Sequence, residues 1–462
     1  HWGVALVLGP NINAPMESVA VPKAYEALQK AMELAPNASE KEQAYINALA
    51  KRYSKEPLEN RKPLDLAYAN SMREVAKRFP DDLDAATLFG ESLMDLIPWA
   101  YWSKTGEASP ETPEILETFE SVLKRNPDHI GAIHLYIHAT EASMHPEKAE
   151  PYAENLGSLV PGAGHLVHMP AHTFMRVGRY HDASVSNKKA DEADDAYVTQ
   201  CKVQGLYPLA YHPHNNHFLS ASAAMEGWSA EAIRAARKTA SQVDQGMMCT
   251  PGWGTLHHYL ATPLYVLTRF GKWDEILAEP RPQEKYIYPV GVWHYARGMA
   301  FLRRNKIDSA RSELKALEEI AADSALNAIT IWDINTSVAL MTIAKELLAG
   351  ELAATRKDFP SAIRHLKKAV AEENELNYDE PPPWNLPVRH ALGAVLLEAQ
   401  RPKEAEEVYR EDLKRYPHNG WGLLGLEQSL RAQGKTEAAD DVKRQFDNVW
   451  THADVKLTAS RF

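Results

Sequence analysis

The chain has 462 residues, of which 45% are hydrophobic and 24% charged, the composition of a globular protein with a large core. Its net charge of −11 argues against a basic surface for nucleic acid, and we expect no nucleic-acid partner. No apolar run approaches the roughly 18 residues of a membrane-spanning helix, so we predict no membrane span. Because the first residue is His1 and not Met, a leader peptide upstream of it would not be visible.

The first predicted element is a short helix that contains Trp2, Leu6 and Leu8. It ends before the segment 9–16, GPNINAPM, because the glycine and the two prolines of that segment cannot continue a helix. We expect this segment to form an ordered loop rich in side-chain amides.

A short turn phrase recurs along the rest of the chain, between stretches with helical hydrophobic periodicity. Its copies place an acidic residue and an alanine after a small or polar turn, and they are GRYHDA (178–183), GWSAEA (227–232), NKIDSA (305–310), RPKEA (401–405) and GKTEA (434–438), with looser copies HPEKA (145–149) and GKWDEI (271–276). Ala149 and Ala183 are 34 residues apart, and Ala405 and Ala438 are 33 apart. A helix pair of about 34 residues is typical of the tetratricopeptide repeat (TPR).

The predicted fold is therefore all-α, a TPR-like α-solenoid of roughly eight or nine helix pairs in a right-handed superhelix. We expect a single solenoid over residues 1–462. Two proline-rich segments, 278–290 and 379–387, interrupt the helical pattern, and we interpret them as joints within that solenoid.

Histidine follows the repeat: 14 of the 19 histidines lie between His129 and His294. The helix before each turn phrase is here named the A helix, and five consecutive A helices carry histidine. These residues are His134 and His138, then His165, His168 and His172, then His212, His214 and His217, then His257 and His258, and finally His294. A helices line the groove of TPR solenoids, and neighbouring helices pack roughly 8–10 Å apart. We therefore expect side chains from several A helices to converge in the groove.

This register predicts a metal site, because neutral imidazole is the commonest metal ligand. The predicted ligands are His134, His138, His165, His168, His172, His214 and His217. We expect Glu141, Glu91 or Asp95 to act as a further ligand or as the general base of a metalloenzyme acting on a small molecule. The predicted cofactor is a divalent transition metal, Cu, Fe or Zn, because imidazole with or without carboxylate suits these ions.

Each part of this prediction also has a simpler explanation. Two histidines at i, i+4, such as His134 and His138, often lie on a solvated helical face. Pro213 makes the start of the segment 212–217 a turn, in which histidines can cap a helix and anchor a loop. The 11 Trp and 19 Tyr are explained by packing between repeats, or by a groove that stacks an aromatic or apolar ligand.

Four segments together resemble a family of bacterial TPR proteins that are commonly exported. The segments are GPNINAPM (9–16), GHLVHMPAHTFMRVGRYHDA (164–183), YPLAYHPHNNHFLSASAAMEG (207–227) and VGVWHYARGMAF (290–301). The resemblance covers most of the chain and implies an α-solenoid in the periplasm or outside the cell, but it implies no reaction. In that family a further helical stretch precedes the segment that opens this chain, so the resemblance also implies truncation at His1.

Two classes of function are consistent with these patterns. The first is a metal-binding solenoid that acts as a metalloenzyme, and the second is a non-catalytic scaffold that binds a protein or peptide partner in its groove. A metal-free hydrolase is less well supported, because the chain has no G-x-S-x-G elbow and neither Cys201 nor Cys249 has a catalytic context. P-loop and G-x-G-x-x-G motifs are absent as well. The pairing of the two cysteines and the oligomeric state stay open.

Overall fold

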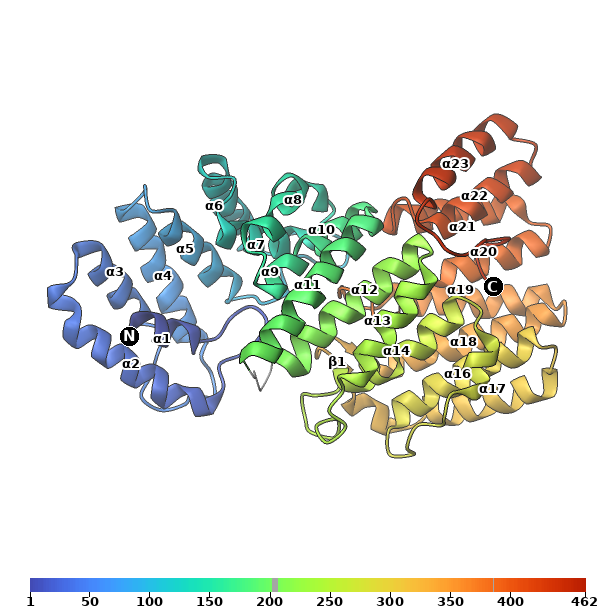
Figure 1. The fold of residues 1–462 in the computed structure, drawn as a ribbon, viewed down its shortest axis with the longest axis horizontal. Coiled ribbons are helices and arrows are strands. Elements are labelled where there is room, and N and C mark those ends of the chain that lie inside the picture. Colours follow the sequence, from blue (N-terminus) through green and yellow to red (C-terminus); the bar gives the residue numbers. More distant parts are fainter. Residues whose placement is uncertain (202–206, 385) are drawn as a thin grey trace. The chain divides into compact units, whose positions relative to one another are not determined.

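The computed structural model describes residues 1–201, 207–384 and 386–462 (Figure 1). These residues form two compact units, unit 1 (His1–Leu159) and unit 2 (Val160–Phe462). Most secondary structure of the described residues is helical, with one small antiparallel pair of strands, β1 (Thr330–Ile331) and β2 (Asn335–Thr336), and two isolated β-bridges. The predicted all-α, TPR-like fold is confirmed. No helix in the described part of the chain is long and apolar enough to cross a membrane.

Unit 1 is a succession of helices in which sequence neighbours pack against each other. They are α1 (Trp2–Val7), α2 (Val21–Leu34), α3 (Glu40–Leu49), α4 (Lys62–Arg78), α5 (Leu83–Met94), α6 (Thr112–Arg125), α7 (Ile130–Glu141) and α8 (Glu150–Leu159). The segment 9–16 forms the predicted ordered loop. The Oδ1 atom of Asn11 stabilises it by accepting hydrogen bonds from the backbone N–H groups of Asn13 and Ala14. Its buried Ile12 fixes the loop to the unit.

Unit 2 continues the pattern of packed helix pairs. Its helices are α9 (Gly164–His168), α10 (Pro170–Val177), α11 (Tyr180–Cys201), α12 (His212–Glu226), α13 (Ser229–Ser241), α14 (Thr255–Arg269), α15 (Trp273–Ala278), α16 (Ile287–Arg303), α17 (Ile307–Ala321), α18 (Ser337–Thr355), α19 (Phe359–Asn374), α20 (Val388–Glu398), α21 (Pro402–Arg415), α22 (Gly420–Ala432) and α23 (Thr436–Val449). A π-helical turn, Tyr207–Tyr211, precedes α12. Helices are interrupted at both predicted joints, and Asn385 of the second joint lies outside the described residues.

The turn phrases of unit 2 are the turns between paired helices. Gly178, Gly227 and Gly434 open three of them with left-handed φ angles of 82°, 80° and 73°. A left-handed residue satisfies the last carbonyl groups of a helix and reverses the chain, and glycine adopts it without a Cβ clash. Asn305 fills the same position at φ 56°. The sequence phrase therefore marks the backbone conformation that each helix pair requires.

Helices distant in sequence also meet within unit 2. The Trp421 indole N–H donates to the backbone oxygen of Ala224, and the Tyr180 hydroxyl donates to that of Pro417. The Asp454 carboxylate accepts hydrogen bonds from the first two backbone N–H groups of α13. The C-terminal part of the chain, from Pro417 to Asp454, therefore helps to fix the positions of α11, α12 and α13.

Candidate metal centre

Three imidazoles from three helices of unit 2 meet in its interior. His168 ends α9, His172 lies in the first turn of α10, and His214 lies in the first turn of α12. The helix over 164–177 is interrupted at Met169, because Pro170 has no N–H to continue the hydrogen-bond ladder. Met169 keeps helical φ and ψ angles of −50° and −37°, so His168 and His172 still share one face.

The ring nitrogens of these three residues converge on one point. The Nε2 atom of His168 lies 2.8 Å from Nε2 of His172 and 3.2 Å from Nε2 of His214. One ligand nitrogen from each residue lies within 4.8 Å of the other two. Two nitrogens bound to a tetrahedral zinc ion at about 2.0–2.1 Å are about 3.3 Å apart. The observed spacing is therefore close to that of a ligand set, and the three residues are named the imidazole cluster.

The hydrogen bond of Asn187 determines the tautomer of His168. The Asn187 Nδ2 group donates to the backbone oxygen of Ala183 at 2.8 Å, so Oδ1 faces the imidazole and lies 2.6 Å from its Nδ1 atom. Nδ1 must therefore carry the proton that is donated, and Nε2 carries the lone pair. A ligand histidine in a metal site is oriented in this way by an acceptor on its other nitrogen. The lone pair of His168 is directed at the centre of the cluster.

The cluster is largely buried and packs against an aromatic ring. His168 is fully buried, and the Phe218 ring packs against all three imidazoles, with centroids 5.0 Å from His168, 5.0 Å from His172 and 5.9 Å from His214. Burial, with smaller contributions from the neighbouring imidazoles, lowers the pKa of His168 well below its ordinary value. The ring is therefore neutral at pH 7, which metal binding requires.

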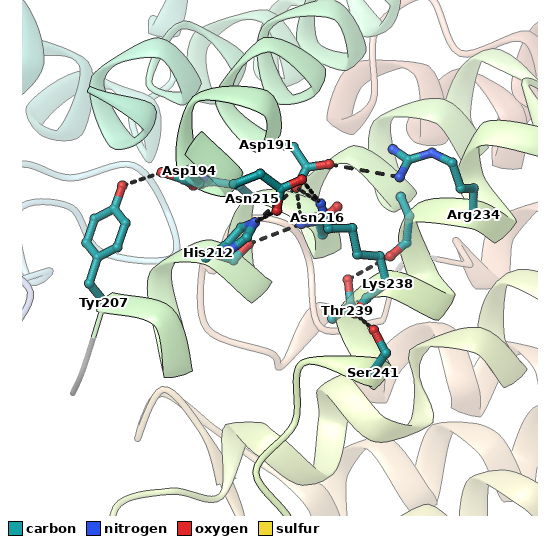
Figure 2. A network of polar contacts seen from close by, with 12 residues as sticks. Asp191, Asp194, Tyr207, His212, Asn215, Asn216, Arg234, Lys238, Thr239 and Ser241 are labelled. Carbon is teal, nitrogen blue, oxygen red and sulfur yellow. Dashed lines mark hydrogen bonds and ion pairs between the residues drawn. The ribbon is translucent and has the colours of Figure 1, made fainter. Parts of the chain in front are cut away.

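The helix α11 supplies a stripe of buried polar side chains that holds the first turns of α12. Asn187, Asp191 and Asp194 are spaced i, i+4 and i+7, so they share one face. Asp191 accepts hydrogen bonds from His212 and Asn216, and Asp194 accepts them from Asn215 and Tyr207. These contacts, shown in Figure 2, measure 3.1, 2.7, 2.6 and 2.6 Å in that order. The stripe therefore positions the helix that presents His214.

A second group with metal-ligand chemistry lies on the same stripe. Asp191, Asp195 and His212 bring ligand atoms within 4.8 Å of one another. The Lys238 ammonium lies 2.7 Å from one carboxylate oxygen of Asp191 and 2.7 Å from one of Asp195. Burial raises the pKa of Asp191, but hydrogen bonds from His212, Lys238 and Asn216 outweigh it and lower the pKa to about 2. These four residues, Asp191, Asp195, His212 and Lys238, are named the lysine network, in which a protein cation contacts both carboxylates.

The start of α9 depends on close approach to the stripe. A Cβ atom on Gly164 would overlap the Oδ1 atom of Asp194. Asp194 is fully buried, and this burial raises its pKa although Tyr207 and Asn215 donate hydrogen bonds to it. Glycine at 164 thus allows the helix that carries His168 to lie directly on α11.

Two further predicted ligands of unit 2 lie beside the imidazole cluster. The His165 ring is 6.1 Å from that of His168 and 5.3 Å from that of Tyr211. The His217 ring packs against His258, with centroids 5.0 Å apart. The convergence of histidines expected from neighbouring A helices thus occurs in unit 2. His217, however, packs against His258 of α14 and is not in the imidazole cluster.

The other predicted site residues belong to unit 1. On α7, the Nδ1 group of His138 hydrogen-bonds to the Glu141 carboxylate at 2.7 Å, and the His134 ring lies 5.0 Å from that of His138. Trp99 approaches His138 edge-on at 5.2 Å. Within this unit Glu141 therefore acts as a positioning residue, because its carboxylate orients the His138 imidazole.

Glu91 and Asp95 surround the buried guanidinium of Arg52. Arg52 forms an ion pair with Asp95 and also donates to the backbone oxygen of Pro10 at 2.8 Å. Burial raises the pKa of both carboxyl groups, against the opposing charge of Arg52. The pair thereby connects α5 to the loop 9–16. Their predicted role as ligand or base stays a prediction.

Sequence reasoning missed the residues that orient the site. Asn187 lies in the stretch SVSNKKADEADD, which is typical of an exposed, charged helix face. Its spacing from Asp191 and Asp194 was the available signal, because polar residues at i, i+4 and i+7 form a stripe. Phe218 gave no signal, because one aromatic residue in an alanine-rich helix is ordinary core.

The matches found among solved structures have low sequence identity and TM-scores below 0.5. No protein-family model and no curated protein matches the sequence. Among solved structures, human IFIT1 with m7Gppp-AAAA matches with a TM-score of 0.38 and 12% identity, over 94% of this chain and 87% of that one. Yeast Tom70 matches with a TM-score of 0.25 and 10% identity, over 83% and 92%. Both are TPR-type helical-repeat proteins.

Proposed function

We propose that the imidazole cluster binds one transition-metal ion, Cu, Fe or Zn, and that unit 2 is a metal-binding TPR-like solenoid. The convergence of three Nε2 atoms, with the lone pair of His168 directed inward by Asn187, carries this proposal. Hydrogen bonding alone would also bring these rings together, since His168 Nε2 can accept an N–H from a neighbouring ring. A bound ion would accept a lone pair from each of the three nitrogens, and this would explain why all three rings converge.

The chemistry of such an ion would be that of a metalloenzyme acting on a small molecule. An ion held by three imidazoles keeps a further position at which it can polarise a substrate or lower the pKa of water. The chain contributes a neutral ligand of fixed tautomer, His168, and an apolar wall, Phe218, that excludes bulk water. This arrangement favours a reactive site over a site that is fully enclosed by four protein ligands.

The test is metal content by mass spectrometry, on protein purified without added metal and then dialysed. We expect about one equivalent of Cu, Fe or Zn in this cluster for the wild type. The double variant H168A/H172A should lose it. The matched control H181A/H452A removes two imidazoles that stack on each other at 3.5 Å outside the cluster, and it should keep the metal. A wild type with the same metal content as H168A/H172A, before and after titration, would overturn the proposal.

A scaffold that binds a peptide is the second candidate, and exposed apolar side chains on unit 1 favour it. Trp99 is 37% exposed with a left-handed φ of 61°, and Met144 is 69% exposed. Aromatic residues and Met are enriched at protein interfaces, so these two side chains are candidates for contact with a partner. A stoichiometric partner that stays bound in chelator and is released by W99A would support this function. A partner retained equally by W99A would count against this surface.

A further inference from the structure

His217 is a buried imidazole whose hydrogen-bonding groups are not satisfied. It lies on α12 one turn after His214 and is only 3% exposed. Neither Nδ1 nor Nε2 has a hydrogen-bond partner among the described residues. Buried polar groups in folded proteins nearly always have a partner, and the exceptions are associated with catalysis, water or ions. This ring therefore points to a ligand.

A second buried imidazole faces it. The ring of His258, on α14, lies 5.0 Å from that of His217 at an interplanar angle of 80°. Its Nδ1 atom is 2.8 Å from the Tyr288 hydroxyl, which lies 3.0 Å from the hydroxyl of Tyr265. The phenol contacts His258 through Nδ1, so in the tautomer that donates Nδ1–H to the phenol oxygen, Nε2 carries the lone pair with which this ring can bind a ligand.

We infer that His217 and His258 bind a second transition-metal ion, of the copper or zinc class that imidazole prefers. The two ring centroids lie 5.0 Å apart, close to the 4.7 Å between His168 and His172 and the 4.9 Å between His168 and His214, so the rings are near enough for one ion to contact both. Burial lowers the pKa of His258 to about 4 and that of His217 well below its ordinary value. Both rings are thus neutral and competent as ligands at pH 7.

The second site is separate from the first. The group of nitrogens within 4.8 Å of one another comprises His168, His172 and His214 without His217. The His217 ring also packs against Tyr259 of α14, with centroids 5.5 Å apart. One turn of α12 thus presents His214 to α9 and α10, and the next presents His217 to α14. The inference uses no residue of the imidazole cluster and goes beyond the proposed function.

The experiment measures binding stoichiometry on the full chain with two probes, Zn²⁺ and, under anaerobic reducing conditions, Cu⁺. For at least one probe we expect one equivalent more in the wild type than in H217L, and the same loss in H258Q, in which an amide can still bond to Tyr288. The matched control H257Q changes the neighbouring buried histidine, whose Nε2 bonds to the backbone oxygen of Met248, and should bind as the wild type does. Circular dichroism checks the fold of each variant.

The outcomes separate the two sites. H168A/H172A should keep the equivalent that H217L loses, so failure of one site leaves the other measurable. If folded H217L binds as many equivalents as the wild type with both probes and melts at a higher temperature, His217 is only a buried, unsatisfied ring and the inference is overturned. Equal stoichiometry of H258Q and wild type with both probes would overturn it as well.

Discussion

The imidazole cluster and the lysine network each include a histidine of the first turn of α12, and both contain residue types that serve as metal ligands. They differ in whether a protein cation contacts the potential ligands. In the lysine network the Lys238 ammonium lies 2.7 Å from one oxygen of each of two carboxylates, and its single charge offsets one of their two negative charges. In the imidazole cluster three Nε2 atoms meet, and Asn187 directs the lone pair of one of them inward. The comparison teaches that ligand type alone does not define a metal site, because a protein cation can serve the same carboxylates.

The largest expected effect is a loss of metal affinity on changing the imidazole cluster, compared with a change in the lysine network. Changing His172 to Ala removes a ligand and should weaken binding at the imidazole cluster by more than about 100-fold, since even loss of an orienting partner costs about 10–100-fold. D191N should leave this affinity within about threefold, because Asp191 is outside the imidazole cluster and the Asn side-chain oxygen can still accept a hydrogen bond from α12. Isothermal titration with Zn²⁺ measures both. Equal losses in the two variants would show that the clusters act as one site.

A change at Asn187 tests the tautomer of His168. The variant N187L removes the acceptor of the Nδ1 proton and should weaken metal binding about 10–100-fold. N187D keeps an acceptor at the same position and should bind within about threefold of the wild type. Competition against a chromophoric chelator gives the affinities. If N187L and N187D bind equally, the contact of Asn187 does not orient the ligand.

Removing the internal cation should make the two clusters more alike. In K238M two carboxylates face each other without the ammonium, which should lower the free energy of unfolding by about 2 kcal/mol, less than for a fully buried pair because Lys238 is partly exposed. The freed Asp191, Asp195 and His212 should then bind one equivalent of Zn²⁺ beyond the wild type. Urea denaturation and titration measure the two effects. A folded K238M without an additional equivalent would contradict the charge-substitution argument.

The smallest expected effect is a pH dependence of stability. The folded pKa of Asp191 is about 2, below the ordinary value of 3.8, so its carboxylate stabilises the fold at pH above about 4. That contribution, up to about 2 kcal/mol, is lost as the pH falls toward 2. The difference in unfolding free energy between wild type and D191N should be constant from pH 7 to 4 and shrink below it. If the difference in unfolding free energy between wild type and D191N persists at the lowest pH, it is caused by packing and not by the charge of Asp191.

The repeat was predictable from sequence because it is written in local signals. The phrases at Gly178 and Gly227 place a glycine where the chain takes a left-handed turn, and an alanine where the paired helices meet. The spacing of His168 and His172 also predicted that they share a helical face, which the structure confirms despite the break at Met169. These features depend only on neighbours within about one repeat.

The sequence by itself thus determined the helices, their turns and the face on which each histidine lies. Only the tertiary structure decided which faces meet: His214 joins His168 across 46 residues, while His217 on the next turn joins His258. It also decided that Asp191 meets the ammonium of Lys238, which is 47 residues away. The physical reason is that helical periodicity is a local property of the backbone. The partner of a face is set by how whole helices pack, and that depends on side chains throughout the unit.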